Sequence, residues 1–404
     1  MIETEQTILS EQMKDSEEET LHPIDDLSNF GIASQDILKL KQAGICTLKG
    51  LTMHTRRNLI KIKGMSETKV DKMKEAVHKF FDSSLTPTTS FMTASQFNCR
   101  REQVLKISTG SSDFDTLLNG GIQTMAITEV FGEFRTGKTQ LSHTLCVTVQ
   151  LLNSTYKAAF IDTEGTFRPE RLKEIAIRYD LNPEQVLENV IYARAHNSEH
   201  QNDLLIHLTN KFIEEPNKFK LLIVDSVISL FRTDFVGRGE LGERQQKLNT
   251  FLSRLLRISE EYNLAVFITN QMMADPSATL SFVADPKKPI GGHVLAHAST
   301  TRIYLRKGRG ETRVAKIYDS PDVPEAEAVY AITVGGIDNA VEYRSYGYRG
   351  MDVTVGGIDN AVEYSGYGYK GIDVIEGGVK YKSYGYRGMD VIEGGVKDMM
   401  GVSI

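Results

Sequence analysis

The chain contains the stretch Gly132-Glu133-Phe134-Arg135-Thr136-Gly137-Lys138-Thr139, which matches the phosphate loop G-x-x-x-x-G-K-[ST] at every fixed position. An apolar, β-prone run at 125–131 precedes this loop, and residues 140–146 are predicted to continue as a helix. A strand, a glycine turn and a helix N-terminus form an anion site, because backbone N–H groups and the helix dipole both favour negative charge. The stretch therefore predicts a nucleotide site, against the alternative of a chance glycine-rich turn.

The fixed positions of this loop have separate expected roles. Gly132 and Gly137 let the backbone curl closely around the β-phosphate. Lys138 is expected to neutralise the β- and γ-phosphates, and the Thr139 hydroxyl to ligate Mg²⁺. The predicted cofactors are therefore ATP and Mg²⁺. The predicted nucleotide contacts of the loop are Gly132, Glu133, Phe134, Arg135, Thr136, Gly137, Lys138, Thr139 and Gln140.

Polar residues also follow other apolar runs. Three such runs are predicted as buried strands: 158–164, 221–226 and 265–271. They alternate with predicted helices, which indicates a doubly wound α/β fold whose ligands bind at the carboxyl ends of the strands. Asp225 fits the acid that holds Mg²⁺ through water. Glu164 is expected to orient and deprotonate the attacking water, and Gln271 to contact the γ-phosphate, which makes Glu164, Lys138 and Gln271 the predicted catalytic residues. The alternatives are a surface carboxylate or a helix N-cap acid for Glu164, and a plain strand-end amide for Gln271.

The composition limits the class of protein. The 404 residues have room for more than one domain, and 40% apolar with 25% charged residues are ordinary globular values. A net charge of −6 does not indicate nucleic acid, so DNA binding must rest on local basic patches. No apolar run reaches transmembrane length, and no membrane partner is expected. The 3 cysteines are widely spaced, which favours a reducing compartment and no zinc site.

The N-terminal part is predicted as an acidic disordered tail at 1–24 and a small all-α domain at 25–81. Two short predicted helices flank a tight turn at Lys63 and Gly64, and such a helix-hairpin-helix presents backbone amides to a DNA phosphate. Basic residues surround the turn: Arg56, Arg57, Lys61, Lys63, Lys69 and Lys72. The alternative is a helical protein-binding module with a solvated basic face.

A polar linker is predicted at 82–103, because its Ser, Thr and Pro residues break any periodicity. It contains Phe91 and Ala94. Phe91 is either an incidental apolar contact or an anchor for a neighbouring molecule, with Ala94 allowing close approach.

Two segments are predicted as mobile loops, at 232–244 and 272–292. Glycines flank Arg238 in the first loop, and the second loop contains Lys287 and Lys288 and directly follows Gln271. Because Gln271 is expected to contact the γ-phosphate, binding of the nucleotide can order the basic loop that follows it. Arg and Lys in such loops suit contact with a phosphate backbone without base readout. Two ordinary surface loops are the alternative.

These residues resemble the eukaryotic branch of the RecA recombinases over roughly 25–340. The resemblance is carried by the stretches 132–140, 161–171, 237–241, 270–271, 287–292, 295–299 and 306–310. The amino-acid sequence of residues 272–276 is most similar to the meiosis-specific branch of this family. The resemblance implies a RecA-like P-loop ATPase core at 104–340, with a mainly parallel central sheet, after a helix-hairpin-helix DNA-binding domain.

The resemblance also implies residue roles. Phe91 and Ala94 match a polymerisation motif at the protomer interface. Arg171 matches a residue lying on the adenine, and His297 a nucleotide-sensing position. Asp319 to Pro321 match a segment that caps ATP from the adjacent protomer, so Asp319 and Pro321 join the nucleotide contacts. The resemblance implies first-loop DNA contacts at Arg232, Arg238 and Arg244. Lys287 and Lys288 of the second loop and Lys63 and Gly64 of the hairpin complete the predicted DNA contacts.

The leading hypothesis is an ATP-dependent recombinase that forms helical filaments on single-stranded DNA. It would catalyse pairing and strand exchange with double-stranded DNA in the nucleus, in meiotic recombination and break repair. The expected partners are DNA, recombination mediator proteins and further copies of the chain, in filaments or rings. Two other hypotheses are a mediator paralogue without strand exchange and a ring-shaped helicase-type motor. The complete phosphate loop argues against the first, and the N-terminal helical module against the second.

The last segment, 341–404, departs from the resemblance. The sequence Val-Gly-Gly-Ile-Asp-Asn-Ala at 334–340 recurs at 355–361, within Gly- and Tyr-rich repeats that are predicted to be strand-like. These repeats are interpreted as a duplicated extension with no role, or as a stacking surface for single strands.

Overall fold

The computed structural model describes residues 21–82, 91–274, 287–340, 369–375 and 378–383. The chain divides into two compact units, Met1–Val341 and Glu342–Ile404. Most of the acidic tail, the centre of the second predicted loop and most of the repeats lie outside the described residues. Within those ranges, every helix is too short or too polar to span a bilayer.

Short helices form the N-terminal part of the first unit. They are η1 (Ile24–Phe30), α2 (Ser34–Gln42), α3 (Leu48–Thr52), α4 (Arg56–Ile60) and α5 (Glu67–Asp82). Their apolar faces meet in one core that includes Leu27, Leu40, Leu51, Val70 and Val77. The Thr55 hydroxyl caps α4 by accepting from the Asn58 N–H at 3.3 Å. Lys63 and Gly64 lie in the turn between α4 and α5, where Gly64 has a φ of 82°.

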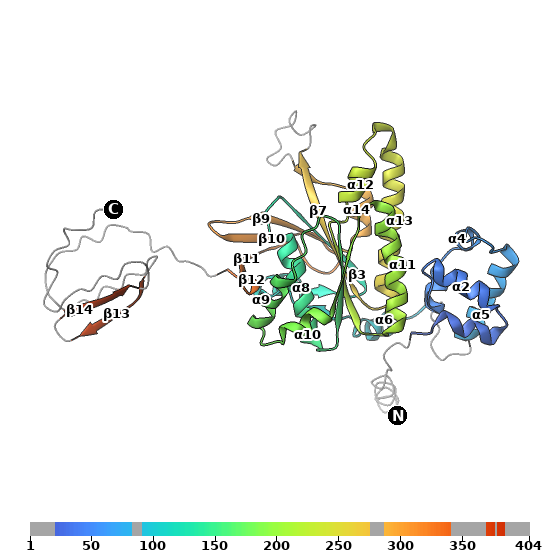
Figure 1. Cartoon of the computed structure of the whole chain (residues 1–404), viewed down its shortest axis with the longest axis horizontal. Coiled ribbons are helices and arrows are strands. Elements are labelled where there is room, and N and C mark those ends of the chain that lie inside the picture. Colours follow the sequence, from blue (N-terminus) through green and yellow to red (C-terminus); the bar gives the residue numbers. More distant parts are fainter. Residues whose placement is uncertain (1–20, 83–90, 275–286, 341–368, 376–377, 384–404) are drawn as a thin grey trace, which may run out of the picture. The chain divides into compact units, whose positions relative to one another are not determined.

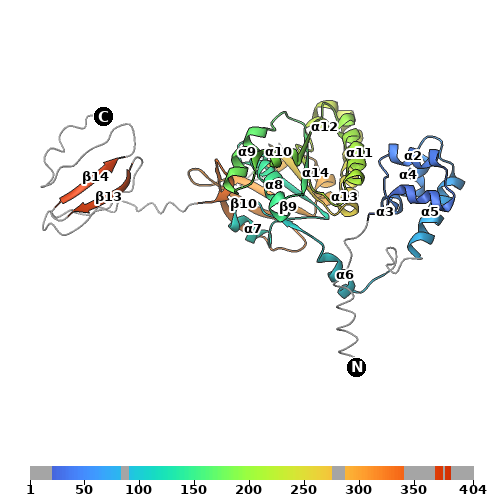
Figure 2. The same cartoon turned by 60° about the horizontal axis from the view of Figure 1, so that its bottom comes forward.

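The predicted linker contains a helix, α6 (Ala94–Arg101), so the expectation of an irregular segment up to residue 103 was wrong there (Figure 2). Thr93 and Gln96 form a capping box: the Thr93 hydroxyl accepts from the Gln96 N–H, and the Gln96 side chain accepts from the Thr93 N–H. Local capping therefore outweighs the low apolar periodicity of this stretch. Phe91 precedes α6, and its side chain is fully exposed.

A ten-stranded sheet forms the centre of the first unit (Figure 1). Its order is β12 (Gly336–Asn339), β11 (Glu327–Thr333), β10 (Thr312–Asp319), β9 (Thr301–Lys307), β3 (Ala126–Gly132), β7 (Ala265–Ala274), β6 (Phe219–Asp225), β4 (Lys157–Asp162) and β5 (Val190–Arg194), with β8 (Lys287–Pro289) paired to β7. The strands from β9 to β5 run parallel, and β9 to β12 pair antiparallel. The predicted α/β fold with a mainly parallel sheet is confirmed.

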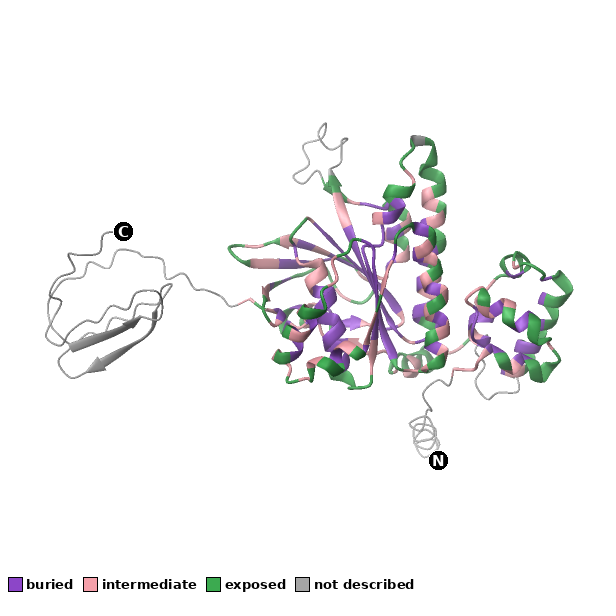
Figure 3. Cartoon of the chain, viewed as in Figure 1, coloured by how far each residue is buried: buried purple, intermediate pink, exposed green. Residues whose placement is uncertain are grey.

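Helices cover both faces of this sheet (Figure 1). One face carries α7 (Ser112–Leu117), α8 (Lys138–Leu152), α9 (Pro169–Arg178) and α10 (Pro183–Glu188), and the other carries α11 (Ser198–Glu214), α12 (Ser229–Asp234), α13 (Leu241–Glu261) and α14 (Gly292–Ala298). Side chains alternate along each strand, so Leu221 and Ile223 of β6 enter one core while Leu222 and Val224 enter the other. Figure 3 shows the resulting buried centre. The carboxyl ends of the strands are left to carry polar residues.

Smaller elements complete the description. They are β1 (Lys106–Ile107), which pairs antiparallel with β2 (Ile122–Gln123), and η2 (Arg238–Glu240) before α13. In the second unit, β13 (Tyr369–Ile375) and β14 (Gly378–Ser383) pair as an antiparallel hairpin. The predicted strand-like character of the repeats is therefore seen in this one segment, and the other repeats fall outside the described ranges.

Candidate functional site

The phosphate loop connects the end of β3 to the start of α8. Gly137 precedes the helix with a φ of 100°, in the region that favours glycine. A Cβ at Gly132 would collide with the Leu305 carbonyl oxygen of the neighbouring strand. The two glycines are thus required by conformation and by space. The loop ends at the N-terminus of a 15-residue helix, which is a ready anion site.

Lys138 lies at the centre of the loop. Its Nζ donates to the carbonyl oxygens of Gly132 and Glu133, each at 2.9 Å. Burial lowers the pKa of Lys138, and the nearby carboxylates of Asp225 and Glu164 act in the opposite direction. The structure therefore brings together three residues that the sequence analysis placed at one site.

Asp225 is a buried carboxylate at the end of β6. Its Oδ1 accepts a 2.5 Å hydrogen bond from Thr269 Oγ1. Its Oδ2 is also buried and accepts no hydrogen bond of ordinary geometry from the described residues. Burial raises the pKa of Asp225, while Thr269 and the nearby Thr139 hydroxyl lower it. An unsatisfied carboxylate oxygen near a hydroxyl fits the oxygen-donor set that Mg²⁺ prefers.

A chain of hydrogen bonds joins Glu164 to Arg232. Gln271 Nε2 donates to Glu164 Oε1 at 2.6 Å, and Arg232 Nη1 donates to Gln271 Oε1 at 3.1 Å. The sequence predicts a loop directly after Gln271, and this prediction is wrong because β7 continues to Ala274 and pairs with β8. Gln271 is therefore held on a strand between the two side chains.

The expected flexible loop at 232–244 is largely helical, which corrects that prediction. Arg232 lies in α12, Arg238 in η2 and Arg244 in α13. The Glu240 carboxylate accepts from the Gly237 N–H at 2.8 Å and caps this start. The apolar face of α13 then packs in the core through Leu248, Phe251, Leu252, Leu255 and Ile258. This burial stabilises a helix where glycines alone predict a loop.

The basic residues of the second predicted loop that are described lie in β8. Lys287 and Lys288 are its first two residues, and the ammonium group of Lys287 forms an ion pair with Glu133 of the phosphate loop. A residue expected to contact DNA is therefore bound to a residue expected to contact the nucleotide. Residues 275–286 lie outside the described part of the chain.

Residues assigned to the adenine and to the cap occupy the surroundings of the loop. Arg171 on α9 donates from Nε to Gln140 Oε1 at 2.9 Å, and its guanidinium also donates to the carbonyls of Thr333 and Val334. His297 lies on α14, and its ring stacks on His293 with centroids 6.1 Å apart.

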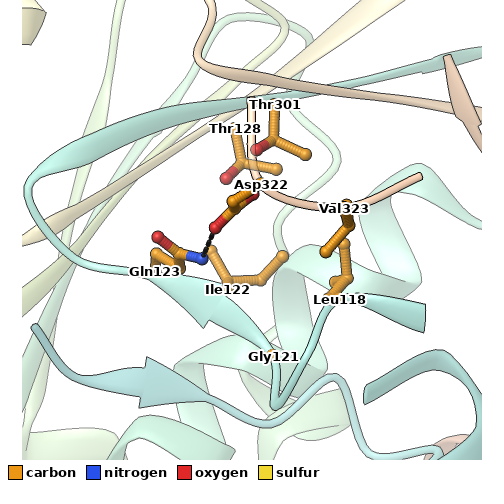
Figure 4. Close-up of a pocket in the computed structure, with 8 residues that line it drawn as sticks. All are labelled: Leu118, Gly121, Ile122, Gln123, Thr128, Thr301, Asp322 and Val323. Atoms are coloured by element: carbon orange, nitrogen blue, oxygen red, sulfur yellow. Dashed lines mark hydrogen bonds between the residues drawn. The ribbon is translucent and has the colours of Figure 1, made fainter. Parts of the chain in front are cut away.

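Asp319 ends β10, and Pro321 follows in the next loop. Asp322, next to Pro321, accepts from Ser320 Oγ at 2.9 Å. It also accepts from Gln123 Nε2 at 2.6 Å, the bond drawn in Figure 4. The cap segment is therefore tied to β2.

Four predicted residues lie in other elements. Lys63 and Gly64 occupy the α4–α5 turn, and Phe91 and Ala94 belong to α6 and the residues before it. Within the described ranges, no hydrogen bond or ion pair joins these four to the phosphate loop.

Several further polar residues around the site are not predicted as functional by the sequence. Asp162 accepts from the Glu164 N–H, and His143 accepts from the Arg168 N–H. Glu129, Asn270 and Arg302 form a buried network beneath the loop. The only sequence signal for Asp162 is its place two residues before Glu164. The network joins residues that are far apart in sequence, so no local pattern indicates it.

A comparison with protein families decides the identity. The Rad51 family profile matches residues 100–340. The chain belongs to the Rad51 family. This confirms the resemblance to eukaryotic RecA-type recombinases and the fold that the resemblance implies.

Individual relatives of this Rad51-family chain are meiotic proteins by name. It is 62% identical over 333 residues to the mouse "Meiotic recombination protein DMC1/LIM15 homolog", covering 81% of this chain and 96% of the relative. The human protein of the same name is 61% identical over the same shares of both chains. The Arabidopsis thaliana "Meiotic recombination protein DMC1 homolog" is 54% identical over 343 residues, 84% of this chain and 97% of the relative.

Proposed function

We propose that this chain is an ATP-dependent recombinase of meiotic recombination in the nucleus. It polymerises on single-stranded DNA and exchanges that strand into a homologous double-stranded DNA. Its identity to relatives named as meiotic recombination proteins supports the process. Homology is then tested by base pairing, since the basic residues suit phosphate contacts and carry no base readout.

The observation that carries this proposal is the bonded chain from Glu164 through Gln271 to Arg232. Its one end is the residue expected to activate water, and its other end is a residue expected to contact DNA. A change at either end alters the partner available to Gln271. This arrangement supports a protein in which DNA binding and nucleotide state are coupled.

The proposed roles at the nucleotide follow from the donors in place. Lys138 leaves the carbonyls of Gly132 and Glu133 to bind the β- and γ-phosphates. Thr139 and Asp225 would hold Mg²⁺, which would supply charge neutralisation when bound. Glu164 orients the attacking water and accepts its proton, and Gln271 contacts the γ-phosphate.

The proposed DNA contacts form two groups. The first-loop arginines Arg232, Arg238 and Arg244 and the lysines Lys287 and Lys288 contact the phosphate backbone near the core, and Lys63 and Gly64 contact it from the helical domain. The ion pair between Lys287 and Glu133 supports an exchange of partners, because a DNA phosphate competes with a carboxylate for the same ammonium group.

Strand exchange is the experiment that tests the function. Full-length protein, a truncation after Ala340 and Lys138→Ala are assayed with homologous and heterologous duplexes in ATP and Mg²⁺. We expect the full-length protein and the truncation to give product with the homologous duplex and none with the heterologous duplex. We expect no product from Lys138→Ala, because this variant loses its affinity for the nucleotide. Product from the truncation alone would mean that the C-terminal repeats block assembly. If ATP binds but neither protein gives product, the recombinase proposal is wrong and the mediator hypothesis replaces it.

A further inference from the structure

The turn that follows β4 is held by a buried carboxylate. Asp162 is fully buried at the end of β4, and its Oδ1 accepts from the N–H groups of Glu164 at 2.9 Å and Gly165 at 2.6 Å. Its Oδ2 accepts from the Phe167 N–H at 3.2 Å. Arg194 of β5 donates to Oδ1 at 2.9 Å and compensates the buried charge. Three backbone N–H groups of the turn that carries Glu164 therefore donate hydrogen bonds to the Asp162 carboxylate.

A buried histidine holds the same turn from the side of the phosphate loop. The His143 side chain on α8 bonds through Nδ1 to the Thr139 carbonyl oxygen at 2.7 Å. Its Nε2 accepts from the Arg168 N–H at 3.0 Å. The direction is fixed because a backbone amide can only donate, so Nε2 carries no proton and Nδ1 donates. Phe160 and Phe167 stack on the ring at centroid distances of 5.9 and 5.4 Å.

Asp162 and His143 connect the phosphate loop to the turn that carries Glu164 by hydrogen bonds to backbone atoms. His143 reaches from Thr139, whose hydroxyl is assigned to Mg²⁺, to the turn that starts at Glu164. Asp162 fixes the other end of that turn to the sheet. The separation between the phosphate loop and the Glu164 carboxylate is therefore set by four hydrogen bonds to backbone amides. Errors of about 1 Å in such a separation can cost ~100-fold in rate.

We propose that Asp162 and His143 are positioning residues that hold the Glu164 turn at its working distance from the phosphate loop. This inference rests on the proposed function, in which Glu164 activates water for ATP hydrolysis. Neither side chain touches the reacting atoms. Both act through the backbone of residues 164–168.

Two substitutions of His143 separate hydrogen bonding from packing. His143→Phe keeps an aromatic ring against Phe160 and Phe167 but removes both hydrogen bonds. His143→Gln loses the ring but keeps an oxygen acceptor for the Arg168 N–H and an amide donor for the Thr139 carbonyl. A positioning role predicts that Gln is the better replacement, and a packing role predicts that Phe is better.

The first measurement is hydrogen exchange in the nucleotide-free protein, on a peptide that contains residues 163–168. We expect ~10-fold faster exchange in His143→Phe, where the Arg168 amide loses its acceptor, and in Asp162→Asn, where the Phe167 amide does, because such amides open more often. His143→Gln should stay within about threefold of wild type. Unchanged exchange in both His143→Phe and Asp162→Asn would overturn the positioning role, and this readout needs no enzymatic activity.

The second measurement is steady-state ATP hydrolysis on single-stranded DNA, with the affinity for a fluorescent ATP analogue measured in parallel. His143→Phe should lower kcat by ~10- to 100-fold while the nucleotide Kd changes less than about twofold. His143→Gln should recover most of kcat. In a Glu164→Gln background, His143→Phe should cause no further loss, because both changes act through the same carboxylate.

The outcomes separate this inference from the proposed function. A wild-type kcat in His143→Phe, or a larger loss in His143→Gln than in His143→Phe, would overturn the inference while the recombinase proposal stands. Wild-type protein without ATP hydrolysis, or Glu164→Gln with the wild-type rate, would overturn the assignment of Glu164 itself. In that case the exchange measurement still decides whether Asp162 and His143 hold the turn.

Discussion

At the scale of single residues, Glu261 of α13 is a buried carboxylate. Its Oε1 accepts a 2.5 Å hydrogen bond from Thr47 Oγ1, and a Cβ at Gly50 would collide with it. Burial raises the pKa of Glu261 to about 7, with the bond from Thr47 acting in the opposite direction. Between pH 4.5 and 7 the folded state keeps a proton that the unfolded state releases. The free energy of unfolding therefore falls as pH rises through this window.

Replacing Glu261 by Gln should therefore stabilise the protein above neutral pH. The amide has the same shape, still accepts from Thr47 and carries no charge. We expect the free energy of unfolding to rise by ~2–3 kcal/mol at about pH 8 and by less than ~1 kcal/mol at about pH 5. Urea unfolding of both proteins at the two pH values measures this difference. A gain that is equal at both pH values would show that ionisation is not its cause.

Single residues also show how far the sequence could be interpreted. Gly132 and Gly137 were predictable because the loop needs a close approach and a positive φ that only glycine tolerates. The bonds from Gln271 to Glu164 and Arg232 were not predicted, although all three residues were singled out. Their meeting depends on strand register, which is set by packing across the whole sheet.

Asp162 and His143 could not be predicted from residue type at all. Both bind backbone amides, which every sequence offers equally. A polar side chain of this kind becomes visible only when the fold shows which amides lie within reach.

At the scale of elements, a buried polar network joins the three central strands. Glu129 of β3 accepts from Arg302 Nε of β9 at 2.6 Å and from Asn270 Nδ2 of β7 at 2.8 Å. Burial raises the pKa of Glu129, and the Arg302 guanidinium acts in the opposite direction. Asn270 also donates to the Ile290 carbonyl oxygen at 2.7 Å, so the network holds the strand that presents Gln271.

Removing one partner of this network should be costly. In Arg302→Met the apolar side chain still packs against the rings of Phe131 and Tyr318, but the buried Glu129 carboxylate loses its cation. We expect a loss of ~3–5 kcal/mol in the free energy of unfolding, measured by urea. The double variant Glu129→Gln/Arg302→Met should recover much of it, since no charge remains to be compensated. A single variant as stable as wild type would mean that water reaches Glu129.

The elements themselves were predicted unevenly. The apolar runs that became β3, β4, β6 and β7 were found because strands buried on both faces are continuously apolar. The segment 232–244 was expected to be a loop because of its glycines. Most of it is helical because the buried face of α13, which begins at Leu248, stabilises a helix that propagates back to Leu241.

At the scale of the whole molecule, the order of the strands was beyond the sequence. The antiparallel part, β9 to β12, follows a parallel part in the same sheet, and local patterns do not distinguish the two. The mainly parallel RecA-like architecture was predicted from the resemblance to the family, because hydrophobic periodicity does not determine the order of strands. The C-terminal repeats lie outside the match to the Rad51 family, which ends at residue 340.

Assembly is the property of the whole molecule that one residue tests most directly. The Phe91 side chain is 107% exposed, just before α6, and a fully solvated phenyl ring gains nothing within one protomer. A ring that is buried by the next copy gives a heterologous contact, which produces filaments or closed rings. This supports the proposed role of Phe91 at the protomer interface.

Phe91→Glu should therefore abolish assembly without damaging the fold. Burying a carboxylate in an apolar site costs several kcal/mol, which exceeds what one contact can recover. We expect monomers by light scattering and no filaments on single-stranded DNA by electron microscopy, with affinity for ATP within about twofold of wild type. Phe97→Glu is the matched control, because Phe97 on α6 is also exposed, at 53%, and should keep assembly intact. Filaments of ordinary length from Phe91→Glu, or their loss in both variants, would contradict a specific role for Phe91.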